Sequence, residues 1–86
     1  MPRWSSTART ELAAELRSSA TAALEGAAYG NQAAAEATDP ATRDRDLAAA
    51  GALRQQAAHM TADANAISDG DDPNSLGYAD SHRYYH

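Results

Sequence analysis

Apolar side chains recur at intervals of three and four residues from about Ser6 to Thr38. Residues at this spacing share one face of an α-helix, because each residue advances about 100° around the axis. Most charged side chains of the segment fall on the opposite face. The pattern predicts a long amphipathic helix with a shallow apolar stripe. The predicted stripe contains Leu12, Leu16, Ala23, Leu24, Ala27 and Gly30.

A second helix is predicted over residues 40–68, where apolar positions alternate strictly between spacings of three and four. This spacing is typical of a coiled-coil seam, in which small and large side chains interlock with a neighbouring helix. The seam residues are Ala50, Leu53, Ala57, Met60, Ala64 and Ile67.

The boundaries of both helices are marked by capping residues. Asp39 is a favoured N-cap and stands directly before Pro40, which is well suited to the first helical position. Gly70 suits a left-handed C-terminal cap, and Pro73 prevents the helix from continuing. One of the residues 5–7 is expected to cap the first helix. The predicted helices cover about residues 6–38 and 40–68.

These elements predict an all-α protein: an Ala-rich antiparallel hairpin over residues 1–67 and an irregular, acidic tail over residues 69–86. Leu, Ile, Val and Phe together account for 7 of 86 residues, about 8%. A chain so poor in large apolar side chains buries little core on its own. We therefore expect two hairpins to pair into a four-helix bundle, as a homo-oligomer or as a subunit of a larger complex.

Composition narrows the range of partners. The net charge of −5 gives no general attraction to nucleic acid or to an anionic membrane. The chain has no cysteine, which excludes disulfides and thiolate chemistry. No signal peptide or membrane-spanning stretch stands out, so we expect a cytoplasmic protein, with leaderless export as the open alternative.

Catalytic motifs are absent from the sequence. The serines cluster at predicted caps and in the tail without a paired base, and no glycine-rich loop follows a strand. The glutamates lack the Glu-x-x-His element of carboxylate-bridged metal bundles. We expect neither enzymatic activity nor a cofactor.

Three histidines leave a metal-binding alternative open. His82 and His86 are four residues apart, a spacing that places two imidazoles on one face of a helical turn. His59 could complete the site if the tail folded back or a second chain contributed. If the tail does not fold back and no second chain contributes, we expect the three histidines to be exposed and to bind no metal.

Several aromatic and apolar residues outside the stripes are candidate partner contacts. Trp4 precedes the first helix and is expected to cover the end of the bundle or to contact a partner. Tyr29 lies on the charged side of the first helix, where an exposed ring or a second interface is expected. The possible anchors of the tail are Leu76, Tyr78, Tyr84 and Tyr85.

In shape, the predicted hairpin resembles the secreted helical-hairpin proteins exported by mycobacterial-type secretion systems. Thr38-Asp39-Pro40 replaces the Trp-x-Gly turn of that family, and no tyrosine after the second helix is followed four residues later by an acid. The resemblance is one of shape and assigns no family. The sequence predicts a non-enzymatic structural or adaptor subunit. A metal-responsive protein and a small antitoxin-like partner that folds on its target are the alternatives.

Overall fold

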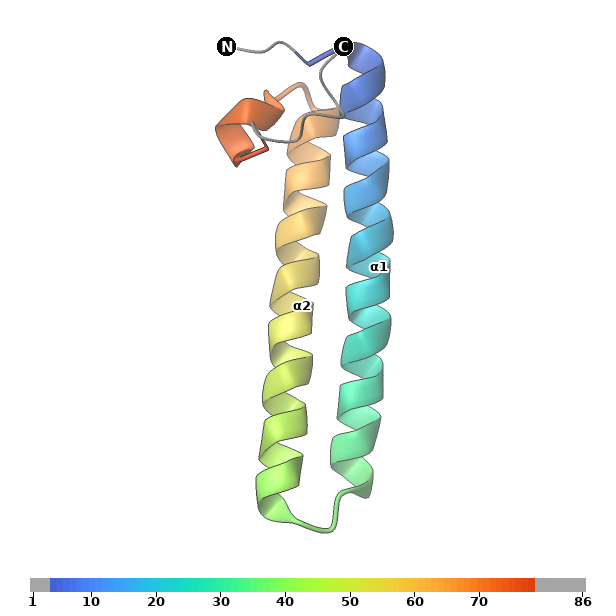
Figure 1. Ribbon diagram of the computed structural model, residues 1–86, viewed down its shortest axis with the longest axis vertical. Coiled ribbons are helices and arrows are strands. Elements are labelled where there is room, and N and C mark those ends of the chain that lie inside the picture. Colours follow the sequence, from blue (N-terminus) through green and yellow to red (C-terminus); the bar gives the residue numbers. More distant parts are fainter. Residues whose placement is uncertain (1–3, 79–86) are drawn as a thin grey trace.

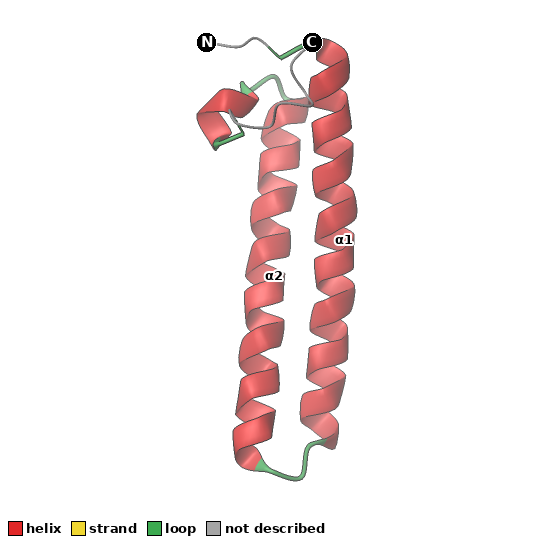
Figure 2. Cartoon of the chain, in the orientation of Figure 1, coloured by secondary structure: helices red, strands yellow, loops and turns green. Residues whose placement is uncertain are grey.

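The computed structural model describes residues 4–78, which form two long helices joined by a short loop and followed by one turn of 3-10 helix. The helices are α1 (Ser6–Glu36) and α2 (Pro40–Ser68), and the 3-10 helix is η1 (Pro73–Leu76). The two helices lie side by side and antiparallel along most of the molecule (Figure 1). No strand occurs in this described range (Figure 2). The predicted all-α hairpin is confirmed.

Side-chain caps fix the start of each helix. The Ser5 hydroxyl oxygen accepts a hydrogen bond from the Ala8 amide at 3.0 Å. The Asp39 carboxylate accepts from the Thr42 amide at 3.0 Å and from the Thr42 hydroxyl at 2.9 Å. The first helix ends at Glu36, two residues earlier than expected, because Ala37 and Asp39 are both extended. Residues before a proline favour this conformation, so the chain reverses over residues 37–39.

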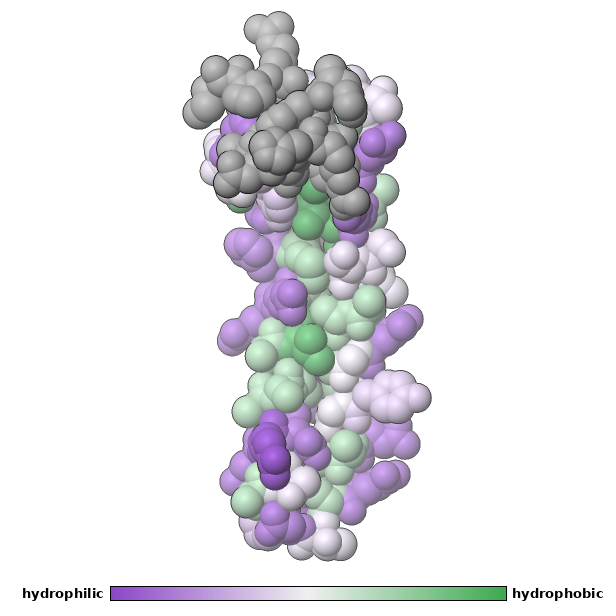
Figure 3. All heavy atoms as spheres, viewed as in Figure 1, coloured by the Kyte–Doolittle hydropathy of each residue, from purple (hydrophilic) through white to green (hydrophobic). Residues whose placement is uncertain are grey.

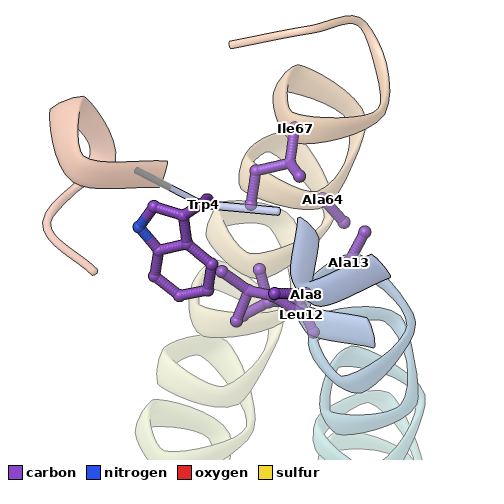
Figure 4. Packing of buried hydrophobic residues seen from close by; sticks show 7 residues of the cluster. Trp4, Ala8, Leu12, Ala13, Ala64 and Ile67 are labelled. Carbon is purple, nitrogen blue, oxygen red and sulfur yellow. The ribbon is translucent and has the colours of Figure 1, made fainter. Parts of the chain in front are cut away.

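The core lies mainly at the open end of the hairpin, which we define as the end where α1 begins and α2 finishes. Trp4, Leu12, Leu16 and Ile67 are buried there. Figure 4 shows the indole of Trp4 beside Leu12, between the helix pair and η1. The smaller residues around them are Ala8, Ala13 and Ala64.

Towards the loop, the contact between the helices is made by alanine and glycine. Ala27, Ala34 and Ala50 are buried. A Cβ added to Gly30 would lie 3.1 Å from the Ala50 Cβ and 3.3 Å from the Asp46 carbonyl oxygen. The two backbones therefore approach too closely here for a large side chain to lie between them.

The prediction of an irregular tail is wrong for residues 73–76. The Asp72 carboxylate accepts a hydrogen bond from the Asn74 amide at 3.0 Å and starts η1. The Trp4 indole donates to the Asn74 side-chain oxygen at 3.0 Å, and Pro73 is fully buried. This order depends on Trp4, which is about 70 residues away along the chain, so the local composition did not reveal it. Residues 79–86 lie outside the described range.

The central role of Trp4 is testable. We expect Trp4→Ala to lower the free energy of unfolding by about 3–5 kcal/mol, because it empties the site between Leu12 and η1. Trp4→Phe keeps an aromatic ring but loses the hydrogen bond to Asn74, so its loss should be smaller, about 1–2 kcal/mol. Urea unfolding followed by circular dichroism measures both. A loss below about 1 kcal/mol for Trp4→Ala would contradict this role.

The close contact at Gly30 predicts opposite effects for two helical glycines. Gly51 has open space around it, since a Cβ there would meet only the end of Arg54 at 3.9 Å. We expect Gly51→Ala to raise the free energy of unfolding by about 0.5–1 kcal/mol through helix propensity. Gly30→Ala should lower it by about 1 kcal/mol, since the steric cost exceeds the propensity gain. Thermal unfolding measures both variants. If Gly30→Ala stabilises the protein as much as Gly51→Ala does, the helices can move apart at Gly30 without a cost in free energy, and the close contact is not limiting.

Candidate interaction surface

Two open grooves follow one side of the hairpin, and large apolar side chains line both. The wider groove, of about 530 Å³, lies between Leu24 of α1 and a row of small residues on α2 that includes Ala58 and Ala62. The second groove, of about 270 Å³, lies nearer the loop and contains Ala35 and Leu47. Leu24 is 51% exposed and Leu47 is 46% exposed.

Helical spacing places both grooves on the same side. In α1, Leu24, Asn31 and Ala35 are separated by seven and four residues, which keeps them on one face. In α2, Leu47, Arg54 and Ala58 have the same separations. We call this surface the Leu24 flank; it comprises the residues that line the two grooves. Apart from the two grooves, Figure 3 shows that apolar residues form a broken band between polar side chains on the face of the hairpin drawn in Figure 1.

The Leu24 flank is basic, although the chain as a whole is acidic. Arg43 and Arg54 line its two grooves, and Arg9 and Arg17 line a pocket that continues the surface to the open end. None of the described residues that line the three is acidic. Within residues 4–78 the structure shows one ion pair, between His59 and Asp63, and none that joins these arginines to a carboxylate. Their positive charge is therefore open to a partner.

Leu24 was predicted as one of the residues that form the core and the interface, and the structure excludes it from the core. Ala23 and Leu24 are adjacent, so they point about 100° apart, and only Ala23 faces α2. The remaining stripe residues lie between the helices. Leu53 and Met60 are partly buried, Leu53 packs over Gly26, and Gly30 is half-buried against Ala50. The buried members are Leu12, Leu16, Ala23, Ala27, Ala50, Ala57, Ala64 and Ile67.

Of the candidate partner contacts, most of those described turn inward. Trp4 is 5% exposed, and Leu76 and Tyr78 pack against its cluster. These three side chains close the open end of the hairpin and are not free for a partner. Tyr29 is 78% exposed and points away from α2. Tyr84 and Tyr85 lie outside the described residues.

A small polar network links the tail to α2. The Tyr78 hydroxyl donates to a carboxylate oxygen of Asp63 at 2.7 Å, and the same oxygen lies 3.4 Å from His59 Nε2. Asp63 is the one buried acidic residue among those described. Burial, reinforced by the hydrogen bond to Asp63, raises the pKa of Tyr78 to about 12. The network pins the tail to the side of α2.

The network contains only two groups that could bind a metal. The residues that the structure describes include no group of three or more histidine, aspartate or glutamate side chains placed to hold an ion. His59 is exposed, and His82 and His86 lie outside the described range. The metal-binding alternative stays a prediction about those two histidines.

Sequence reasoning overlooked Leu47, the burial of Asp63 and the alignment of the arginines. A signal was present for the flank, since Arg17, Leu24 and Asn31 repeat every seven residues, as do Leu47, Arg54, Thr61 and Ser68. For Asp63 no local signal exists, because its burial depends on Tyr78 from the tail.

Comparisons with protein-family models, with curated proteins and with solved structures gave no match. Neither α1 nor α2 is apolar enough over a sufficient length to cross a membrane.

The raised pKa of Tyr78 predicts a loss of stability at high pH. Below about pH 10 the folded and unfolded chains both keep the phenolic proton, so the hydrogen bond contributes fully. Between about pH 10 and pH 12 the unfolded chain releases the proton while the folded chain keeps it, so the free energy of unfolding falls as the pH rises. The advantage of the unsubstituted protein over Tyr78→Phe should therefore shrink across this range.

Urea unfolding at a series of pH values measures this difference. Tyr29→Phe is the matched control, because it removes the hydroxyl of an exposed tyrosine and should leave the pH dependence unchanged. A difference between the unsubstituted protein and Tyr78→Phe that stays constant with pH would contradict the assigned network.

Proposed function

We propose that the protein is a non-enzymatic adaptor that binds an acidic amphipathic helix of a partner protein along the Leu24 flank. The observation that carries the proposal is the combination of two exposed leucines and two arginines in the paired grooves. Adding one or two partner helices would complete a three- or four-helix bundle, in which both grooves are covered.

The apolar part of the flank supports a helical occupant. Between the two leucines, the surface consists largely of alanine and other small side chains, which let another helix approach closely. Leu24 and Leu47 lie outside the seam between the two helices and are 51% and 46% exposed. Burying an exposed leucine against a partner contributes about 1–2 kcal/mol each.

The charge on the flank supports an acidic partner over a second copy of the chain. A two-fold dimer built on this surface would place Arg43 and Arg54 of one copy near the same arginines of the other. Like charges brought together in an interface disfavour association, whereas carboxylates on the partner would be attracted. The four-helix bundle is thus proposed as a hetero-complex, and self-association is an outcome that the test distinguishes.

The test uses synthetic peptide helices with leucines at heptad a and d positions and either glutamate or lysine at the flanking positions. We expect the glutamate peptide to bind, to bind more weakly as salt increases, and to bind at least about tenfold more weakly to Leu24→Glu. The matched control is Ala22→Glu, an exposed alanine on the other side of Ala23. It should bind as the unsubstituted protein does. Fluorescence anisotropy measures the affinity.

Light scattering and circular dichroism across a hundredfold dilution complete the test. A helical monomer that binds the glutamate peptide agrees with the proposal. A dimer that Leu24→Glu dissociates, with no peptide binding, would replace the acidic partner by a second copy. A monomer with little helix would favour the antitoxin-like alternative, in which the chain folds on its target.

A further inference from the structure

Beyond the Leu24 flank, the open end of the hairpin contains a pocket of about 200 Å³, and five of its seven described lining residues carry hydrogen-bond donors on their side chains. Its lining includes two arginines, Arg9 and Arg17, and three residues with hydroxyl groups, Ser6, Thr10 and Ser68. Among residues 4–78, no carboxylate lines the pocket. A water molecule in the liquid occupies about 30 Å³, so the pocket has room for a small polyatomic ion.

Both arginines are held in place by neutral acceptors. Arg9 donates from Nη2 to the Ile67 carbonyl oxygen at 3.3 Å. Arg17 donates from Nη2 to the Ser68 hydroxyl at 2.8 Å and to the Asn65 side-chain oxygen at 3.4 Å. These bonds position the guanidinium groups without neutralising them. Two positive charges therefore share one pocket in a protein whose net charge is −5.

Arg9 also has an unused donor. Its Nε is buried and has no hydrogen-bond partner. A buried donor without an acceptor carries a free-energy cost, which is larger for a charged group. Because guanidinium groups bind oxyanions through two parallel hydrogen bonds, a small rotation of the Arg9 guanidinium would let an entering oxyanion accept from Nε.

The start of α1 adds to the same field. Ser6 and Arg9 lie in its first turn, where the amide groups carry a partial positive charge. Ser5 satisfies the Ala8 amide with its side chain, and the Arg9 amide donates to the Ser5 carbonyl oxygen. The amides of Ser6 and Thr7, which come before these two, have no acceptor within the helix. An anion in the pocket would lie near this positive end.

From this arrangement we propose that the pocket binds a phosphate-type oxyanion, either free inorganic phosphate or the phosphoryl group of a small monoester. A tetrahedral oxyanion presents several acceptor oxygens to the surrounding donors. Two guanidinium groups and the hydroxyls of Ser6 and Ser68 supply donors on several sides, whereas the Thr10 hydroxyl already donates to the Ser6 carbonyl oxygen. This arrangement suits a tetrahedral ion better than the two oxygens of a planar carboxylate. The site is independent of the proposed helix partner, which occupies the grooves nearer the loop.

The experiment is a titration of the ¹⁵N-labelled protein with inorganic phosphate, sodium chloride keeping the ionic strength constant. Arginine side-chain Nε–H signals are observed directly in the ¹H–¹⁵N spectrum. We expect saturable shifts of the Arg9 Nε–H signal and of the Ser6 and Ser68 amides. A parallel titration with glycerol 3-phosphate distinguishes the two sources: tighter binding than phosphate assigns the site to a monoester, and equal or weaker binding assigns it to the free ion.

Arg17→Gln and Arg54→Gln form a matched pair, because each removes one positive charge and only Arg17 lines the pocket. Phosphate binding should weaken at least about tenfold in Arg17→Gln and stay within about twofold in Arg54→Gln. Circular dichroism checks that both variants keep their helices. Leu24→Glu should retain phosphate binding even if it loses the peptide helix, so the two proposals fail separately.

Three results would overturn the oxyanion site. One is the absence of saturable shifts in the folded protein at phosphate concentrations of tens of millimolar. Another is equal weakening in Arg17→Gln and Arg54→Gln, which would reduce the effect to general electrostatics. The third is acetate binding as tightly as phosphate, which would assign the pocket to a carboxylate.

Discussion

The close approach of the two helix backbones at Gly30 and Ala50 makes the hairpin narrow at this level and admits only small side chains there. A single added Cβ at Gly30 would meet both the Ala50 side chain and the Asp46 carbonyl oxygen. At the level of Gly30 and Ala50 no larger side chain fits between the helices, and Leu24 and Leu47 lie on the outside because their helical positions turn them away from the facing helix. Leu24 and Leu47 therefore remain on the surface of a narrow hairpin, where another molecule can contact them.

At the open end the helices carry larger residues, which form the main buried cluster. Leu12, Leu16 and Ile67 need a cover that two helices alone do not supply. Trp4 from before α1 and η1 from after α2 provide it, and the Trp4–Asn74 hydrogen bond joins the two segments. The tail is thus part of the fold up to Tyr78, whose hydroxyl is held by the buried carboxylate of Asp63.

The sequence predicted the features that neighbouring residues determine, and it did not predict those that depend on contacts between segments far apart along the chain. The N-cap at Asp39, the seam from Ala50 to Ile67 and the glycine turn at Gly70 follow from local rules, and the structure contains all three. Leu24 was misplaced because a stripe drawn at 100° per residue cannot decide which of two adjacent residues faces the neighbour. Order at η1, burial of Asp63 and the donors around Arg9 and Arg17 depend on contacts between distant segments, which periodicity does not reveal.

The net charge of the chain was also a poor guide to its partners, because it does not show where the charges lie on the folded molecule. The value of −5 averages over a molecule on which Arg9, Arg17, Arg43 and Arg54 gather along one side without acidic neighbours in its grooves. At physiological salt an exposed charge acts over about 8 Å, which is much shorter than the 52 Å length of the hairpin. A ligand on the Leu24 flank therefore meets the local arginines rather than the average charge, and an acidic protein can present a surface selective for anions.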